Sequence, residues 1–254
     1  MKEAAPHNIE LIESDDRALL VARDAVPRDE SAIVLHEIAV ACAREHSFVD
    51  HQTYPRSLHP NPEMRLSELF TFASVIVSLR TTLGIEMGVT RALINATHGN
   101  DDELLSLTRE QIADIVRPSG LAENKAAYIT EGLDKLSADP DYAAEILRND
   151  SVAETRKKLL KLKGVGSKAV DCFMLLGLNM PVFPVDVNVF RVVTRNVPEV
   201  LGADVVPSFD NPHHTRKVKE YLEQAFAQDV SAYQVLHTYL LLAEKYRMAS
   251  RGSS

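Results

Sequence analysis

Apolar residues recur every three or four positions over most of this 254-residue chain, and the runs that show this spacing are short. Such spacing places apolar side chains on one face of an α-helix. No segment alternates apolar and polar residues for long enough to indicate a strand. The sequence therefore predicts an all-α fold of short helices, at 29–48, 66–80, 86–97, 101–106, 109–117, 121–136, 140–148, 152–162, 167–178, 186–196, 213–227 and 230–248.

Polar residues and glycines mark the predicted ends of these helices. Asp101 and Ser151 stand where N-caps belong. A polar stretch punctuated by proline, from His51 to Pro62, interrupts the helical spacing and predicts a linker. Glycines also lie at or near helix ends, namely Gly99, Gly120, Gly164 and Gly177.

The composition is that of a soluble protein, with 45% hydrophobic and 25% charged residues. No apolar run approaches the roughly 20 residues of a membrane helix, and the N-terminus does not resemble a signal peptide. We therefore expect no membrane association and a cytoplasmic location at the nucleoid. Cys42 and Cys172 lie in apolar segments, which indicates buried, reduced thiols. Two cysteines cannot supply the four thiolates of an iron–sulfur cluster, so we expect no metal and no cofactor.

The formal net charge of -8 argues against DNA binding only until its distribution is considered. Residues 1–50 carry eleven acidic and five basic side chains, a balance of -6, which leaves -2 for the rest. From Arg156 to Lys168 there are six basic residues and no acidic one. Such a run is most often a solvated helix face, and beside a phosphate-binding motif it indicates a nucleic-acid surface.

The segment Leu159–Val170, with the sequence LLKLKGVGSKAV, joins an amphipathic helix to a new helix through two glycines. Gly164 and Gly166 let the backbone turn tightly and approach another surface. The first N–H groups of the new helix then offer an anion site. A GxG segment by itself is more often a plain connection between helices.

A second motif, Pro184-Val185-Asp186, begins another helix, and Asp186 lies eighteen positions after Lys168. Alone, Asp186 would be interpreted as the N-cap of that helix. Together, LxGVGxK and this PVD resemble the endonuclease III branch of the helix-hairpin-helix DNA glycosylases, in order and in spacing. The resemblance implies a helix-hairpin-helix at about 156–178, with Lys168 and Asp186 as the catalytic residues.

The resemblance covers most of the chain and implies two helical domains with a cleft between them. Residues 66–196 match the family's helical barrel, and 28–50 with 197–254 match a second domain that both chain ends build. Residues 1–27 form an N-terminal extension outside the resemblance. The expected DNA-binding residues are Lys161, Lys163, Gly164, Val165, Gly166, Ser167, Arg80, Asn188 and Arg191.

The chemistry of the two catalytic side chains fits base excision. A lysine amine that displaces a base at C1′ forms an imine with the opened sugar, which permits strand cleavage by β-elimination. Partial burial and a helix N-terminus both disfavour the ammonium form, so the pKa of Lys168 should fall. Asp186 would take up the proton and offset the positive charge that builds on the sugar. The target base must first be flipped out of the stack.

The sequence departs from the family at three places. It lacks the four-cysteine loop that holds an iron–sulfur cluster in most endonuclease III relatives, because the branch lost it or the chain was trimmed. Arg80 stands where the family pushes a glutamine into the gap left by the flipped base, although a surface arginine fits this position equally well. Asn188 replaces the histidine usual in bacterial endonuclease III, and the residues around it resemble the plant 5-methylcytosine glycosylases.

We therefore predict a monomeric DNA glycosylase with abasic-site lyase activity, which removes a damaged or modified pyrimidine from double-stranded DNA through a lysine Schiff base. A 5-methylcytosine or mismatch-thymine glycosylase of the same superfamily is an alternative, as is a monofunctional enzyme that uses water. The remaining alternative is a non-catalytic binder of DNA structure. Retention of both Lys168 and Asp186 disfavours that binder, because an anchor needs neither.

Overall fold

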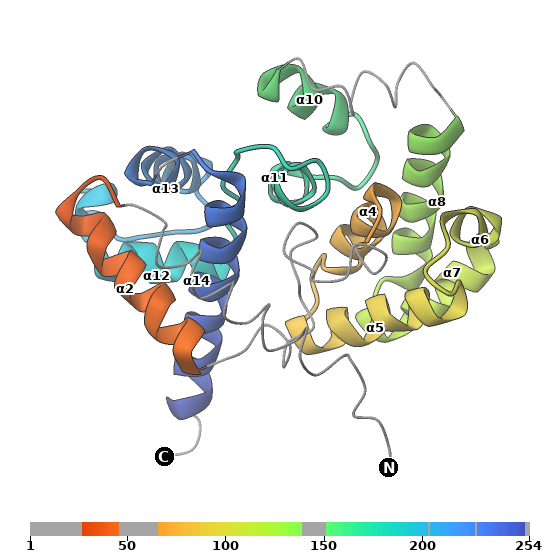
Figure 1. The fold of residues 1–254 in the computed structure, drawn as a ribbon, viewed down its shortest axis with the longest axis horizontal. Coiled ribbons are helices and arrows are strands. Elements are labelled where there is room, and N and C mark those ends of the chain that lie inside the picture. The colour runs from red at the N-terminus through yellow and green to blue at the C-terminus, as the bar shows by residue number, and fades with distance from the viewer. Residues whose placement is uncertain (1–26, 46–65, 139–150, 203, 227, 252–254) are drawn as a thin grey trace, which may run out of the picture. The chain divides into compact units, whose positions relative to one another are not determined.

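The structure is a computed structural model that describes residues 27–45, 66–138, 151–202, 204–226 and 228–251 (Figure 1). Within these ranges every regular element is a helix, and extended pairing is limited to one bridge between Pro27 and Phe226. The all-α prediction is thus confirmed. The predicted helix 140–148, the linker 51–62 and residues 1–26 lie outside the described residues. In the described ranges, every helix is too short or too polar to span a membrane.

The chain divides into two compact units. The hairpin unit contains the described residues 66–138 and 151–180, and the terminal unit contains 27–45 and 181–251. The sequence predicted a boundary between 196 and 197, whereas the contacts divide the chain between Met180 and Pro181. The reason is that α12 (Val187–Asn196) packs against α2 (Glu30–Glu45) and α14 (Val230–Arg251), and so belongs to the terminal unit.

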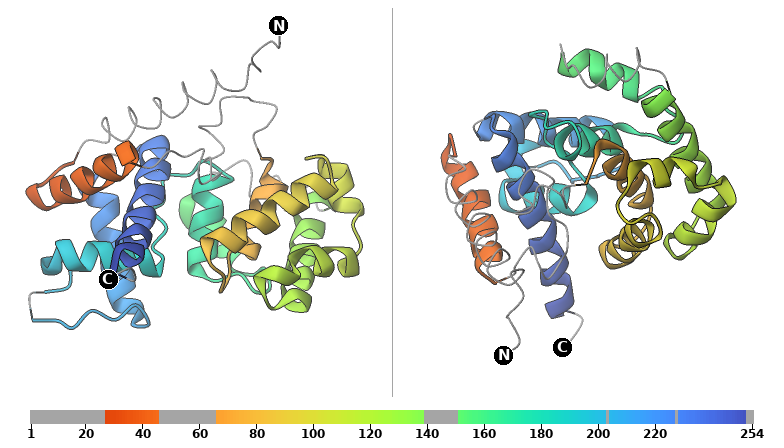
Figure 2. Two further views of the ribbon diagram at one scale, coloured as in Figure 1. Left: turned by 90° about the horizontal axis from the view of Figure 1, so that it is seen from below. Right: turned by 45° about the vertical axis from the view of Figure 1, so that its right-hand side comes forward.

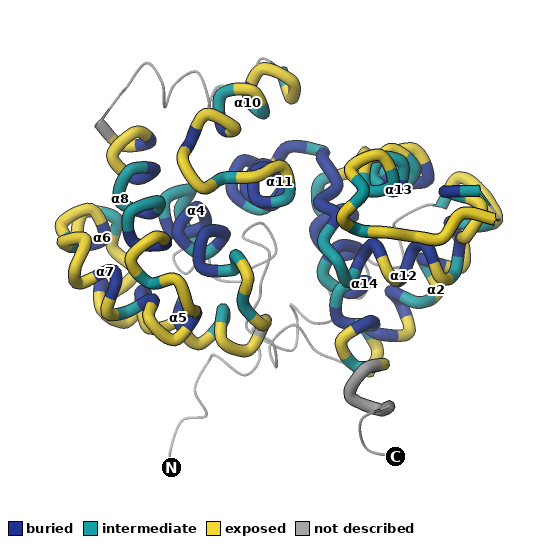
Figure 3. The backbone as a smooth tube through the Cα atoms, turned by 180° about the vertical axis from the view of Figure 1, so that it is seen from behind, coloured by how far each residue is buried: buried dark blue, intermediate teal, exposed yellow. Residues whose placement is uncertain are grey.

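The hairpin unit is built around α4 (Glu68–Val77), of which seven of ten residues are buried. Phe72 of α4 meets Phe173 of α11 edge to face, with ring centroids 5.5 Å apart. Figure 3 shows both helices largely buried, whereas α5, α6 and α7 carry exposed outer faces. The other elements are α5 (Leu83–Ala96), α6 (Asp101–Ser106), α7 (Arg109–Val116), η3 (Arg117–Ser119), α8 (Ala122–Ala138), α10 (Val152–Leu159) and α11 (Ser167–Leu176).

The terminal unit joins segments from the two ends of the described chain. Helices α2 and α14 lie side by side in both views of Figure 2, as orange and dark blue ribbons. The Arg195 guanidinium of α12 binds the Glu244 carboxylate of α14 through two hydrogen bonds, of 2.5 and 2.9 Å. Its remaining elements are η4 (Pro198–Val200) and α13 (Pro212–Ala225).

Local caps account for most helix starts. The Ser151 side chain accepts a hydrogen bond from the N–H of Glu154, which confirms its predicted role as an N-cap. The predicted cap Asp101 was wrong by one position, because Asn100 accepts from two N–H groups of the first turn. The Asp101 carboxylate instead accepts from the Ser67 hydroxyl at 2.5 Å, and so connects the starts of α6 and α4.

Candidate active site

The hairpin between α10 and α11 requires glycine at position 164. Its backbone has φ +77, a left-handed value that side chains other than glycine adopt only with strain. A Cβ atom here would also lie 2.2 Å from the ring of Tyr128, which α8 places against the hairpin. Both the turn and the packing therefore require Gly164.

Gly166 differs from Gly164 in both respects. Its φ of -94 and ψ of 174 are open to any residue, and a Cβ atom built on it meets nothing within 4 Å. Gly166 is the N-cap of α11, and no side chain caps the helix there. The N-cap residue thus provides no side-chain acceptor for the first N–H groups of α11, as is common where a helix start binds an anion.

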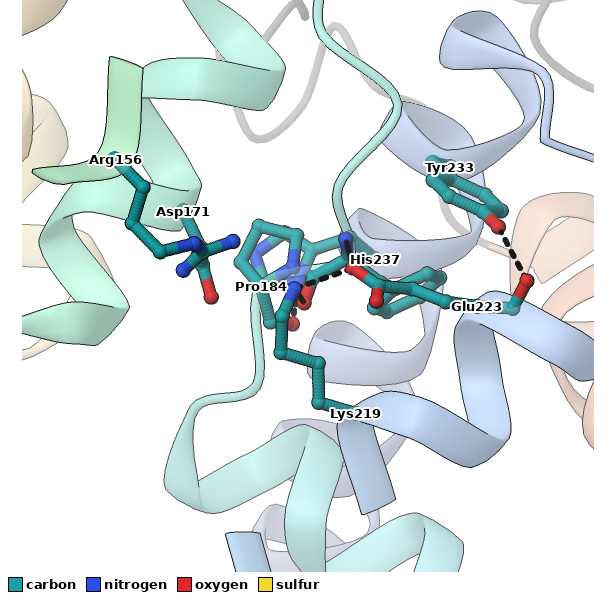
Figure 4. A network of polar contacts seen from close by, with 8 residues as sticks. Arg156, Asp171, Pro184, Lys219, Glu223, Tyr233 and His237 are labelled. Carbon is teal, nitrogen blue, oxygen red and sulfur yellow. Dashed lines mark hydrogen bonds and ion pairs between the residues drawn. The ribbon is translucent and has the colours of Figure 1, made fainter. Parts of the chain in front are cut away.

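Of the basic run predicted between Arg156 and Lys168, Arg156 is not part of an exposed surface. Lys161, Lys163 and Ser167 are exposed, and Val165 is half-buried. Arg156, by contrast, forms an ion pair with Asp171, whose side chain is only 5% exposed (Figure 4). This pair connects α10 to α11 across the hairpin. The Arg156 side chain is bound to Asp171 and is only 25% exposed.

Lys168 is the second residue of α11 and is half-buried. Its Nζ donates a hydrogen bond to the Ser78 Oγ at the end of α4, at a distance of 3.3 Å. This contact brings together two segments that are 90 residues apart. Ser78 had no predicted role, because nothing in the local sequence indicates such a contact.

Asp186 caps α12, as its position alone would suggest. Its Oδ1 accepts from the N–H groups of Asn188, at 2.9 Å, and Val189, at 2.8 Å. Both cap bonds use the same oxygen, so the cap does not occupy Oδ2. Asp186 as a whole is half-buried.

The loop that precedes Asp186 is held by three side chains of the terminal unit, here termed the loop clamp: Lys219, Glu223 and His237 (Figure 4). The Phe183 N–H donates to Glu223 Oε1 at 2.9 Å, and the Phe183 carbonyl accepts from Lys219 Nζ at 3.1 Å. The Pro184 carbonyl accepts from Nδ1 of His237, which is 6% exposed, at 3.1 Å. The clamp was not predicted from the sequence. An i,i+4 pair of Lys219 and Glu223 was its only local sign.

The predicted site residues are divided between the two units. Lys168 and the segment that carries Arg80 lie in the hairpin unit, where Arg80 is exposed and has φ +53. In the terminal unit, Asp186 and half-buried Asn188 lie at the N-terminal end of α12, and exposed Arg191 lies near the middle of this helix. Among the described residues, no three His, Cys, Asp or Glu side chains are grouped as metal ligands would be.

No protein-family model matches the chain. An Arabidopsis thaliana protein that is named as a DNA glycosylase is 35% identical over 102 residues, which are 40% of this chain and 35% of the relative. The endonuclease III of Rickettsia conorii is 28% identical over 161 residues, 60% of this chain and 72% of its own. The chain thus spans about a third of the first relative and more of the second.

A solved structure of an endonuclease III trapped covalently on DNA has the same fold. It matches with a TM-score of 0.54, over 83% of this chain and 84% of that chain, at 20% identity. At this identity the match shows the shared fold.

Proposed function

We propose that this chain is a member of the helix-hairpin-helix DNA glycosylase superfamily and excises a modified base from double-stranded DNA, a proposal supported by its similarity to an endonuclease III and to another DNA glycosylase. Lys168 is the nucleophile in this proposal. The observation that carries it is a half-buried amine on the first turn of a helix whose N-terminus is left uncapped. One helix start thereby offers an anion site and a nucleophile together.

The hairpin binds the DNA backbone in this proposal. A phosphate oxygen can approach the N–H groups of α11 closely because Gly166 has no side chain and its surroundings are open. Lys161 and Lys163 are exposed on the same hairpin and supply positive charge. The acidic net charge is no obstacle, because binding depends on the charges that face the phosphates.

Lys168 performs the covalent step. Its neutral amine bonds to C1′ as the glycosidic C1′–N bond breaks, and the base leaves with the electron pair and takes up a proton. Loss of a proton from the amine and opening of the sugar ring give the imine. Removal of a C2′ proton then expels the 3′ phosphate, and water hydrolyses the imine to release Lys168.

Asp186 assists through the oxygen that its cap leaves unused. While Oδ1 holds the start of α12, Oδ2 accepts the amine proton and offsets the positive charge on the sugar. The loop clamp fixes the backbone just before Asp186, and so limits where this carboxylate can lie. Exposed Arg80 fills the gap in the duplex, and Asn188 and Arg191 contact the DNA from α12.

A panel of duplexes tests the proposal, each with one modified pyrimidine: an oxidised thymine, a mismatched thymine or 5-methylcytosine. Base release and strand cleavage are scored separately. We expect release from at least one of these bases, followed by cleavage at the same position. Binding of the duplexes without release of any base would instead make the chain a non-catalytic binder.

A further inference from the structure

The end of α4 presents a hydroxyl group with a fixed direction to Lys168. Ser78 Oγ donates its one proton to the Val75 carbonyl at 2.7 Å and accepts from Lys168 Nζ at 3.3 Å. A serine hydroxyl has a single hydrogen to donate. Because that hydrogen is committed to Val75, Ser78 meets Lys168 as an acceptor.

Lys125 holds the end of α4 from inside the hairpin unit. Its side chain is 1% exposed, and its Nζ donates to the carbonyls of Val77 and Ser119, each at 2.8 Å. Burial lowers the pKa of Lys125, while the charge of Glu86 raises it to a smaller extent. This anchor fixes the residue that directly precedes Ser78.

The partner helix is fixed in the same unit. The edge-to-face contact of Phe72 with Phe173 packs α11 against α4. Ser78 at the end of one helix and Lys168 at the start of the other are therefore set by packed cores, and neither is carried on a free loop.

We propose that Ser78 is a positioning residue for Lys168, an inference that rests on the function proposed above. A neutral lysine amine has two N–H groups and one lone pair. Ser78 accepts one N–H and has no proton to offer the lone pair, so it turns the amine without blocking it. Ser78 therefore does not compete with the sugar carbon for the lone pair, and less rotational freedom is lost when the amine attacks.

The test uses a duplex with a preformed abasic site. No base has to be recognised or released there, so the measured rate reports attack by the amine alone. Borohydride trapping is measured with protein in excess over a range of concentrations, which separates the maximal rate from the half-saturating concentration. Ser78→Ala should lower the maximal rate about tenfold, the effect expected of one lost hydrogen bond. Its half-saturating concentration should stay within about twofold of wild type, because the phosphate contacts are elsewhere. Ser78→Thr keeps the hydroxyl and should restore most of the rate.

Ser74→Ala is the matched control. Ser74 lies one turn earlier on α4, and its hydroxyl contacts Thr90 at 3.0 Å. This variant should trap at the wild-type rate. A wild-type rate in Ser78→Ala, or equal losses in Ser78→Ala, Ser78→Thr and Ser74→Ala, would overturn the role of Ser78 and leave Lys168 as the nucleophile. Failure of wild type to trap at all would overturn the proposed function, and this inference with it.

Discussion

Two helix starts carry the proposed reaction, and they are built in opposite ways. Helix α11 begins after Gly166, which has no side chain to cap the helix. Helix α12 begins at Asp186, which fills the same position with its own carboxylate. The open start suits a ligand that arrives from outside, and the capped start suits a side chain that must itself be held in place.

The supports of the two starts differ as well. An aromatic ring packs against the α11 hairpin, where Tyr128 fills the space over Gly164. The loop before α12 is held by the polar contacts of the loop clamp.

The largest effect on activity is expected at Asp186, which is both the N-cap of α12 and a proposed catalytic residue. Asp186→Asn should slow base release about a hundredfold or more, because an amide cannot take up the proton. Its stability should stay within about 0.5 kcal/mol of wild type, since asparagine caps a helix about as well as aspartate. Single-turnover base release and urea unfolding measure the two quantities.

Asp186→Ala is the companion variant, which should lose the activity and also about 1 kcal/mol of stability. If Asp186→Asn released base at the wild-type rate, Asp186 would be a cap and nothing more.

The two hairpin glycines should respond differently to alanine. Gly164→Ala places a side chain at positive φ and against the Tyr128 ring, and should cost about 2–4 kcal/mol of unfolding free energy. Gly166→Ala should cost less than about 0.5 kcal/mol but weaken DNA binding about tenfold, because the methyl group obstructs the phosphate. Similar stability losses in both variants would mean that the α11 start is built for folding alone.

The far end of α12 provides a pH test of the terminal unit. The hydrogen bond from Arg195 lowers the pKa of Glu244, and burial opposes this shift. A carboxyl group with a lowered pKa stabilises the fold above its ordinary pKa of 4.5, and this contribution is lost as pH falls through the lower folded value.

Glu244→Gln should therefore cost about 2 kcal/mol at neutral pH, a value reduced because Arg195 is one-third exposed. In urea unfolding the gap to wild type should narrow below pH 4.5. A gap that stays constant with pH would show that the carboxylate charge contributes nothing.

The smallest effect concerns the exposed lysines beside the open helix start. Replacing Lys161 and Lys163 with alanine should lower the slope of log affinity against log salt by about one for each lost phosphate contact. The salt slope of Lys157→Ala, a variant on α10, can be compared with theirs, because Lys157 belongs to the same basic run. An unchanged slope would mean that Lys161 and Lys163 point away from DNA.

The helices could be predicted from the sequence because their boundaries have local causes. The predicted bounds of α6 and α7 differ from the structure by at most one residue, since caps and apolar spacing act within a turn. The packing of α12 against α2 and α14 was not predicted, and this too has a clear cause. An amphipathic pattern indicates that a face is buried, but not which helices cover it.

The supports of the site were less visible. Lys125 lies on the same buried stripe of α8 as Ile129, Leu133 and Leu136, so its position did carry a signal. The contact between Ser78 and Lys168 carries none, because it depends on how two distant helices pack. Similarly, the sequence presents both hairpin glycines alike, and only the backbone angles and neighbours distinguish Gly164 from Gly166.

The central claim is that Lys168 attacks the sugar, and borohydride trapping tests it most directly. Wild-type protein should become covalently attached to a duplex that carries an abasic site when borohydride reduces the imine. Lys168→Gln should abolish this attachment and keep the affinity for DNA within about threefold, because backbone N–H groups make the phosphate contacts. Attachment by Lys168→Gln at the wild-type rate would contradict the account, because another amine would then be the nucleophile.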